Sequence, residues 1–129
     1  MNYLLDTHAL LWWWSTPEKL SPRVLSLMKD PENRFFVSAA SAWEIATKYR
    51  IGKFPQGGTI IEEWAIRIRE DRFEELPISS HHALRAGRLP GEHRDPFDRM
   101  LAAQGILEEL PVISIDPAIS SLGAARRLD

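Results

Sequence analysis

The sequence predicts an α/β protein, a three-layer sandwich in which a central parallel sheet of four to five short strands is flanked by helices. The first observation is that short, mainly apolar runs such as Tyr3–Leu5 and Pro111–Ile115 lack a polar–apolar alternation, which is typical of strands buried on both faces. The second is that helical segments separate these runs, and strands separated by helices pair in parallel. Because such crossovers are right-handed, the residues that directly follow the strands should share one edge of the sheet.

Strands and helices are expected to alternate along one domain that spans residues 1–129. The predicted elements are a strand at 3–5, a helix opened by Asp6, a turn at 16–18, a helix from 22 that ends at Asp30, a strand at 34–37, a helix from Ser38 to about Arg50, a loop at 51–58, a helix from Thr59, a strand at 73–76, a helix from Ser79 to Gly87, a loop at 89–94, a helix from Asp95 to roughly Leu110, a strand at 111–115 and a helical turn opened by Asp116. The last residues, Gly123 to Asp129, are weakly patterned and form either an edge strand or a tail.

Residue types favoured at helix ends support these boundaries. Ser21 followed by Pro22 is a typical cap and first helical position, and Ser38 is expected to cap the third helix. Thr59 with Glu62 three residues later predicts a capping box. The helix that begins there should bury one apolar face, formed by Ile61, Trp64, Ala65 and Ile68.

The composition is that of an ordinary globular domain and excludes several kinds of site. The chain of 129 residues is 44% hydrophobic and 26% charged, which is sufficient for a single core. It contains no cysteine, so neither a disulfide framework nor a thiolate metal site can form. The net charge of -2 gives no overall basic field, so a bound polyanion would be held by local arginines or by metal ions. The first apolar run is too short to span a bilayer and follows no basic segment, so we expect a soluble, cytoplasmic protein without a membrane partner.

Four carboxylates, of Asp6, Glu44, Asp98 and Asp116, are expected to meet at the carboxyl edge of the sheet, where open parallel sheets bind ligands. The alternative is that the three aspartates, together with Asp95, only cap helices, where the helix dipole favours acids. Capping requires no carboxylate, however, because Ser, Thr or Asn serves as well. Converging carboxylates would raise one another's pKa values unless a divalent cation were bound. Oxygen ligands alone suit Mg²⁺ or Mn²⁺ and argue against zinc.

Glu44 is the acid that capping explains least well. If Ser38 caps its helix, Glu44 lies in the second turn, beyond the unpaired amide groups. The alternative is a surface ion pair with Lys48 four residues later. Its neighbours Trp43 and Ile45 are apolar and favour a position inside the protein.

Three segments resemble the PIN-domain nucleases, and most of all the VapC-type toxins of bacterial type II toxin–antitoxin pairs. They are Leu4–Trp12 (LLDTHALLW), Ser38–Ile45 (SAASAWEI) and His93–Gln104 (HRDPFDRMLAAQ). The segments stand in the order found in the family, the resemblance covers nearly the whole chain, and the last segment is the most specific. The weak closing strand after Gly123 is the one departure from the family pattern.

The resemblance implies a metal-dependent endoribonuclease that hydrolyses RNA phosphodiester bonds. Asp6 and Asp98 would hold Mg²⁺, with Mn²⁺ as a possible substitute, and Glu44 and Asp116 would bind a second ion or orient metal-bound waters. Residues expected around the metal or the substrate are Thr7, Lys48, Asp95, Arg99 and Ser114. For these five the alternative roles are backbone capping, solvent exposure or ion pairing.

The resemblance also implies a cognate antitoxin and a homodimer. The first helix carries three successive tryptophans about 100° apart, which a single sheet face cannot cover. We therefore expect Trp12, Trp13, Trp14 and Trp64 to border an apolar groove between this helix and the Ile60–Ile68 helix, where an amphipathic antitoxin segment would insert. The alternative is that the following loop and the helix around Trp64 bury all three tryptophans of the first helix.

Three other functions fit the sequence less well. A phosphoacceptor domain would need adjacent acids after the first strand, where Asp6 stands alone. A phosphatase with an Asp-x-Asp nucleophile would need an acid at the position of His8. A catalytically silent PIN-like scaffold that binds a protein would not need the full set of four acids, and it is kept as the alternative.

Overall fold

The computed structural model describes residues 1–92, 94–122 and 127–128 and confirms the predicted α/β architecture. The elements are β1 (Asn2–Leu5), α1 (Thr7–Ser15), a 3₁₀ turn η1 (Pro17–Lys19), α2 (Pro22–Lys29), β2 (Arg34–Ser38), α3 (Ala39–Arg50), α4 (Gly57–Glu62), α5 (Trp64–Glu70), β3 (Glu74–Leu76), α6 (Ser80–Arg88), α7 (Pro96–Leu107), β4 (Val112–Ile113), α8 (Pro117–Ser121) and β5 (Arg127–Leu128). Within these residues no helix is long and apolar enough to cross a membrane.

The five strands form one parallel sheet in the order β3-β2-β1-β4-β5. The edge strand β5 pairs with β4, so part of the weakly patterned end of the chain does join the sheet. Residues 123–126 and 129 of that end lie outside the described residues. The described residues therefore form five strands, the upper of the two values that were predicted.

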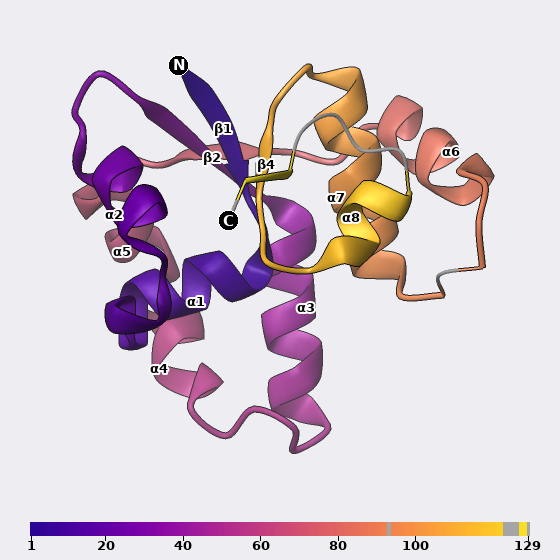
Figure 1. Ribbon diagram of the computed structural model, residues 1–129. Helices are drawn as coiled ribbons and strands as arrows, with labels where there is room; N and C mark the ends of the chain where they lie inside the picture. Colours follow the sequence, from indigo (N-terminus) through magenta and orange to yellow (C-terminus); the bar gives the residue numbers. More distant parts are fainter. Residues whose placement is uncertain (93, 123–126, 129) are drawn as a thin grey trace.

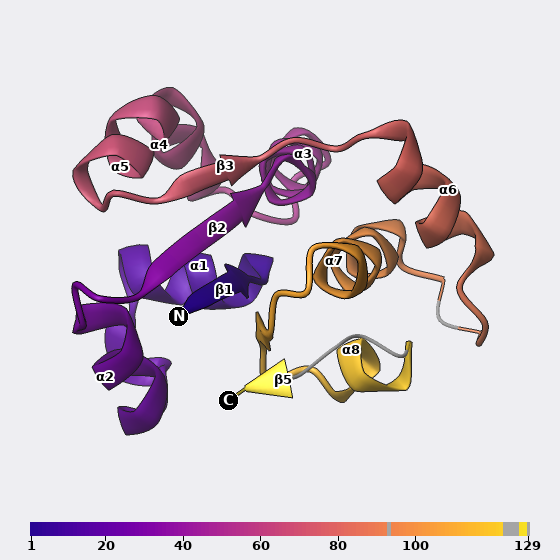
Figure 2. The ribbon, with the colours of Figure 1, turned by 90° about the horizontal axis from the view of Figure 1, so that it is seen from above.

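Helices cover both faces of the sheet, as the lack of alternation in the strands predicted. Side chains of successive strand residues point to opposite faces. Tyr3 and Leu5 join a core formed with α1, α2 and α5, whereas Leu4 joins a second core with α7 and α8. Figures 1 and 2 show these two groups of helices on opposite sides of the strands, with α6 packed outside α7.

The carboxyl ends of the strands meet at one edge, where α1 and α3 begin (Figure 1). In the strand register, Leu5 stands opposite both Val37 of β2 and Ile113 of β4. The residues that come next in the three strands are therefore neighbours at this edge, and they are Asp6, Ser38 and Ser114. This edge is where the candidate ligands were predicted to gather.

The prediction of one helix capped by Thr59 was wrong. Gly57 already begins α4, and the helix ends at Glu62 before a separate α5 starts at Trp64. A Cβ on Gly57 would lie 2.8 Å from the ring of Phe54, so the chain turns closely against this ring before the predicted cap is reached. The break also changes the buried face: Ile60 and Ile68 are buried, whereas Ile61 and Ala65 are exposed.

The helix predicted to reach Leu110 is three residues shorter, and the strand after it has two residues instead of five. Glu109 has a φ of 56°, in the left-handed region that ends helices. The amide of Leu110 then donates to the carbonyl oxygen of Gly105 at 2.9 Å, which closes the last turn. The helix therefore ends at Leu107 and the chain enters β4 at Val112.

Gly105 allows α7 to pack closely against β4. A Cβ at this position would lie 2.8 Å from Cγ2 of Val112 and 3.2 Å from the carbonyl oxygen of Leu110. We expect Gly105→Ala to lower the free energy of unfolding by about 1–3 kcal/mol, because neither neighbour can move freely in the core. The control Gly87→Ala, in α6 with no atom near the added Cβ, should raise it by about 0.5–1 kcal/mol. Urea unfolding midpoints compare the two, and wild-type stability in Gly105→Ala would contradict the packing argument.

Candidate active site

Asp6 is a buried acid at the junction of β1 and α1. Its Oδ1 accepts a hydrogen bond of 2.7 Å from the amide of Ala9, so Asp6 does cap α1. Burial raises the pKa of Asp6 to about 6; hydrogen bonds from Ser114 and Ala9 and the nearby His8 oppose this rise, whereas the charge of Asp98 adds to it. Asp6 thus lies where burial disfavours its negative charge. A helix cap does not require such a buried charge.

Glu44 lies inside the protein in the second turn of α3, with only 3% of its surface exposed. Its Oε2 accepts a hydrogen bond of 2.5 Å from Nζ of Lys48, so the predicted pair exists, although the acid is not at the surface. Its Oε1 is buried and has no hydrogen-bond partner among the described residues. A buried carboxylate oxygen without a partner is costly, and a bound cation would remove that cost.

Lys48 connects Glu44 to the beginning of α7. Burial lowers the pKa of Lys48, but the hydrogen bond and the charge of Glu44 outweigh this effect, so the pKa is raised overall. The charges of Asp95 and Asp98 contribute to the same rise. The ammonium group therefore stands among acids from two different helices.

Asp95 and Asp98 lie at the beginning of α7, Asp95 directly before the helix and Asp98 in its first turn. Asp95 is the cap, because its Oδ1 accepts hydrogen bonds from the amides of Phe97 at 2.8 Å and Asp98 at 3.3 Å. Asp98 is half-buried, and its charge acts on the pKa values of both Asp6 and Lys48. The beginning of α7 thus brings Asp98 into the electrostatic environment of the acids from β1 and α3.

Asp116 lies at the same edge of the sheet as Asp6, but its carboxylate acts as a helix cap. Its Oδ1 accepts a hydrogen bond of 2.9 Å from the amide of Ala118. Its own amide donates to Oγ of Ser114 at 2.9 Å, and the Ser114 hydroxyl is hydrogen-bonded to Asp6. Ser114 therefore links the two acids.

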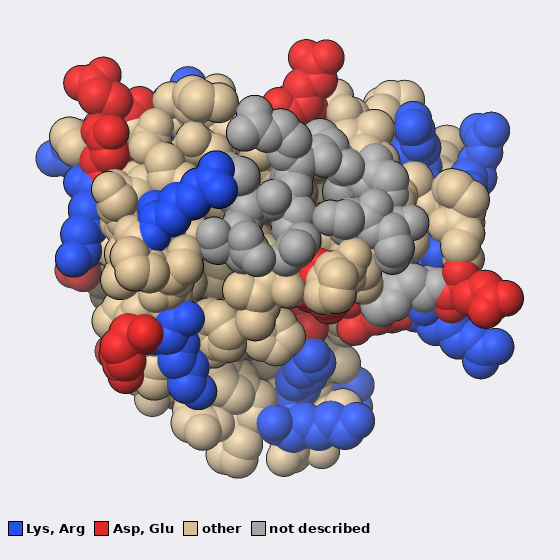
Figure 3. All heavy atoms as spheres, in the orientation of Figure 1, with Lys and Arg blue, Asp and Glu red and all other residues tan. Residues whose placement is uncertain are grey.

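The residues at this edge fit a divalent cation by the chemistry of their donor atoms, which are carboxylate oxygens. Two features would be relieved by a cation: the unpartnered Oε1 of Glu44 and the disfavoured charge of Asp6. Within the described part of the chain, however, no three acidic or histidine side chains are already gathered as ligands around one point. Figure 3 shows acidic side chains at the centre of this face of the molecule, with basic side chains beside them over the far end of α3.

Two of the predicted supporting residues hold the helices together. Oγ1 of Thr7 and Oγ of Ser41 are hydrogen-bonded at 2.9 Å, which joins the beginnings of α1 and α3. The guanidinium of Arg99 donates from Nε to the carbonyl oxygen of Ala86 at 3.0 Å and from Nη2 to that of Leu89. Because Arg99 is used to fix the end of α6, we do not include it among the residues that contact a substrate.

The tryptophans of α1 are divided between packing and an open surface. The indole N–H groups of Trp13 and Trp14 both donate to Oδ2 of Asp71, at 3.2 and 2.7 Å. The ring of Trp14 also packs edge-on against Trp64, with centroids 5.5 Å apart. All three tryptophans of α1 are half-buried, and Trp12 lines a groove that begins at Thr7 and Glu44.

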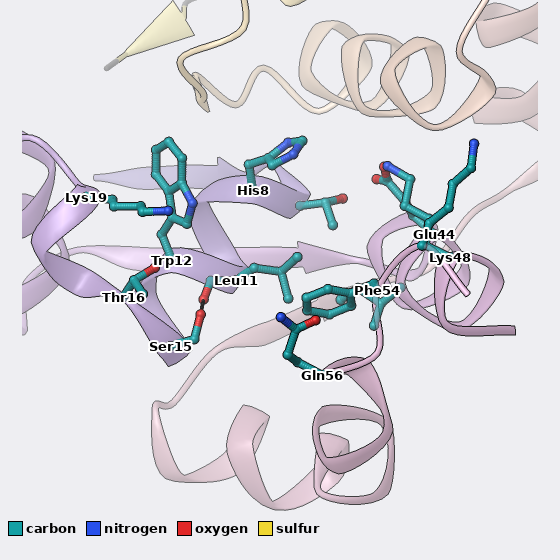
Figure 4. A pocket seen from close by; sticks show the side chains of 13 residues that line it. His8, Leu11, Trp12, Ser15, Thr16, Lys19, Glu44, Lys48, Phe54 and Gln56 are labelled. Carbon is teal, nitrogen blue, oxygen red and sulfur yellow. Dashed lines mark hydrogen bonds and ion pairs between the residues drawn. The ribbon is translucent and has the colours of Figure 1, made fainter. Parts of the chain in front are cut away.

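This groove has a volume of 510 Å³ and lies between α1, α3 and the loop before α4 (Figure 4). The residues that line it are Thr7, His8, Leu11, Trp12, Ser15, Thr16, Lys19, Glu44, Ile45, Lys48, Lys53, Phe54 and Gln56. Lys19, Lys53, Phe54 and Gln56 were not predicted as site residues. They come from two turns distant in sequence, and only the packing of α1 against α3 brings them together, so no local pattern could have identified them.

Comparison with known proteins shows the family to which the chain belongs. The family model described as the PIN domain matches residues 3–124. Over 63 residues, 49% of the chain, the protein is 40% identical to Ribonuclease VapC16 of Mycobacterium tuberculosis (strain ATCC 25618 / H37Rv). The matching segment spans 43% of the length of that relative, so less than half of it is compared.

Solved structures share the fold over the whole chain. The VapBC2 structure of Rickettsia felis, determined bound to a DNA fragment from their promoter, superimposes with a TM-score of 0.71 and 17% identity, covering 99% of this chain and 98% of the other. VapBC-1 of nontypeable Haemophilus influenzae gives 0.67 and 19% identity, covering 100% and 98%. FitAcB of Neisseria gonorrhoeae gives 0.65 and 18% identity, covering 100% and 97%. With a family match that extends over nearly its full length, the chain belongs to the PIN domain family.

Proposed function

We propose that this protein is a metal-dependent endoribonuclease and the toxin of a type II toxin–antitoxin pair. The observation that carries the proposal is the buried Oε1 of Glu44, which has no partner among the described residues. The charge of Asp98 acts both on Asp6 and on Lys48, the ion-pair partner of Glu44, which supports a common site for the three acids. Membership of the PIN domain family and the partial likeness to Ribonuclease VapC16 support a nuclease that acts on RNA.

Asp6, Glu44 and Asp98 are the residues that would hold Mg²⁺, or Mn²⁺ in its place, with Asp116 at the border of the site. When bound, the cation supplies a Lewis acid that polarises water and stabilises negative charge on the phosphate. The chain itself orients the acids: the amide of Ala9 fixes Oδ1 of Asp6, and the first turn of α7 fixes Asp98. Ser114 holds Asp6 and Asp116 in a fixed relation.

A cognate antitoxin is the proposed protein partner, and the structural likeness to VapBC2 and VapBC-1 supports it. An outer hollow of 280 Å³ lies between α1 and α4, and of the four tryptophans predicted to border the antitoxin groove it is lined by Trp14. Its lining residues are Trp14, Ser15, Thr16, Phe54, Gln56, Thr59, Ile60 and Arg67. An amphipathic segment would place apolar side chains on Trp14 and Ile60, and a homodimer through another surface would be compatible with this arrangement.

The test is an RNA-cleavage assay with purified protein, with and without a chelator. We expect endonucleolytic products with Mg²⁺ or Mn²⁺, none with EDTA, and recovery when the metal is added back. A catalytically silent scaffold would give no metal-dependent product with any RNA while still binding its protein partner. That result would replace the proposed activity by the scaffold function.

Lys48 should compete with the metal for Glu44. In Lys48→Gln the Glu44 carboxylate loses its only described ion-pair partner, so without metal the free energy of unfolding should fall by about 1–3 kcal/mol. Mn²⁺ should bind more tightly to this variant, because no ammonium group has to be displaced. Calorimetric titration with Mn²⁺ and thermal unfolding in EDTA measure the two effects, with Lys29→Gln, at the end of α2, as the control. Weaker Mn²⁺ binding to Lys48→Gln would instead assign Lys48 the task of orienting Glu44.

A further inference from the structure

We propose that the groove along α1 binds single-stranded RNA on one side of the scissile phosphate, with Trp12 as a stacking surface for a base and Lys19 and Lys53 as contacts for backbone phosphates. This inference rests on the proposed function. It assigns Lys19 and Lys53, which were not predicted as site residues, and it gives Trp12, which was predicted to border the antitoxin groove, a role in RNA binding instead. The groove starts at Thr7 and Glu44, beside the acids, and continues away from them to Lys19 and Gln56 (Figure 4). A strand whose phosphate lies at the acids would therefore continue along the groove.

The charge of the groove fits a polyanion. Three lysines line it, Lys19, Lys48 and Lys53, and Glu44 is the single acid among its lining residues, all of which lie in the described part of the chain. Lys48 already forms an ion pair with that acid, whereas none of the ion pairs found among the described residues uses Lys19 or Lys53. Because the whole chain carries a net charge of -2, this concentration of lysines is a local feature.

The aromatic residues of the groove fit an unpaired base. Trp12 is half-buried, and its ring lies edge-on to His8 with centroids 6.4 Å apart. Nζ of Lys19 is 6.0 Å from the centroid of the Trp12 ring, so an ammonium group and an aromatic face are offered together. Phe54 and Gln56 face α1 from the opposite wall (Figure 4). Aromatic faces beside lysines are the arrangement by which proteins bind single strands without reading a duplex groove.

The groove and the outer hollow are next to each other but differ in chemistry. They share Ser15, Thr16, Phe54 and Gln56, but the lysines line only the groove. The outer hollow has Ile60 and Arg67 in their place and is the proposed antitoxin site. An occupant of the outer hollow would thus cover part of the wall that RNA uses, which gives the antitoxin a steric means of inhibition.

The test measures binding of a fluorescent single-stranded RNA in EDTA, where cleavage is prevented, over a series of salt concentrations. For single strands each lost phosphate contact should reduce the slope of log affinity against log salt by about 0.7, so Lys19→Gln and Lys53→Gln should each give this change and the double variant about twice as much. Lys29→Gln, an exposed lysine of α2 outside the groove, is the matched control and should keep the wild-type slope.

Trp12 is tested by two substitutions whose melting temperatures are recorded first. Trp12→Leu should weaken RNA binding by about fivefold or more, whereas Trp12→Phe, which keeps an aromatic face, should lose much less. A duplex of the same sequence should bind more weakly than the single strand, because its bases cannot reach Trp12. In cleavage assays the lysine variants should raise KM more than they lower kcat.

Two outcomes separate this inference from the function on which it rests. If the wild-type protein cleaves RNA while Lys19→Gln, Lys53→Gln and Trp12→Leu bind it like the control, the groove assignment is wrong and the nuclease stands. If these variants weaken only antitoxin binding, the groove belongs to the protein partner and the inference also fails. If the wild-type protein neither binds nor cleaves RNA with any metal, the proposed function itself is wrong.

Discussion

Asp98→Asn is expected to reduce the rate of RNA cleavage by at least about a hundredfold while the protein stays folded. Residues that only support metal ligands typically contribute about 10–100-fold, so loss of a ligand charge should cost at least as much. Asparagine has nearly the same size, and the cap of α7 is Asp95, whose hydrogen bonds to the amides of Phe97 and Asp98 do not involve the altered side chain. The measurements are initial cleavage rates and thermal unfolding of the same preparations.

The control for Asp98→Asn is Glu70→Gln, which removes one charge from an exposed acid at the end of α5. This control should retain wild-type cleavage. A variant at Asp98 that unfolds at a lower temperature but still cleaves RNA would show that the acid only favours the start of its helix. That outcome would remove Asp98 from the proposed metal site.

The position of the candidate site could be predicted because it follows from local rules and from the direction of the strands. Asp6 was placed at the end of a strand by the apolar run before it, and parallel pairing put Ser114 next to it. Ser38 was predicted as a cap and Ser79 as the beginning of a helix, and the side chains of both accept amide hydrogen bonds at the helix start. A capping pattern does not exclude that the same acid also belongs to a ligand site. Asp6 is both a helix cap and a buried acid at the candidate site.

The features that the sequence did not predict depend on packing between distant segments. The Thr59 capping box was a sound local pattern, but the close approach of Gly57 to Phe54 starts the helix earlier. Lys19 and Lys53 follow no helical or strand spacing in the sequence, since Lys19 lies in a 3₁₀ turn and Lys53 in a loop. The tryptophans were predicted to border an antitoxin groove, and this stays a prediction. Their hydrogen bonds could not be foreseen, because Asp71, which accepts from the indoles of Trp13 and Trp14, is distant in sequence.

Asp6→Asn is expected to stabilise the metal-free protein near neutral pH, although it should abolish cleavage. The pKa of Asp6 is about 6 in the folded protein, compared with 3.8 as its ordinary value. Between pH about 4 and about 6, the folded protein therefore keeps a proton on Asp6 that the unfolded chain has already lost. The contribution of Asp6 to stability is greatest below pH about 4 and falls as the pH rises through about 6. The ionised carboxylate then costs about 3 kcal/mol, an upper value that Asn would recover while still accepting from the amide of Ala9.

The comparison that decides this prediction is thermal unfolding of wild type and Asp6→Asn in EDTA, at pH about 4 and about 7.5, and again with saturating Mn²⁺. In EDTA the two proteins should be similar at the lower pH, and the variant should melt at the higher temperature at the upper pH. Mn²⁺ should reverse this order, because a ligand that binds only the folded wild type adds stability that the variant cannot gain. Asp6→Asn could instead be less stable than wild type at both pH values in EDTA. The hydrogen bonds of the buried carboxylate would then stabilise the folded protein by more than its charge destabilises it, and the claim that a cation relieves an unfavourable charge at Asp6 would be wrong.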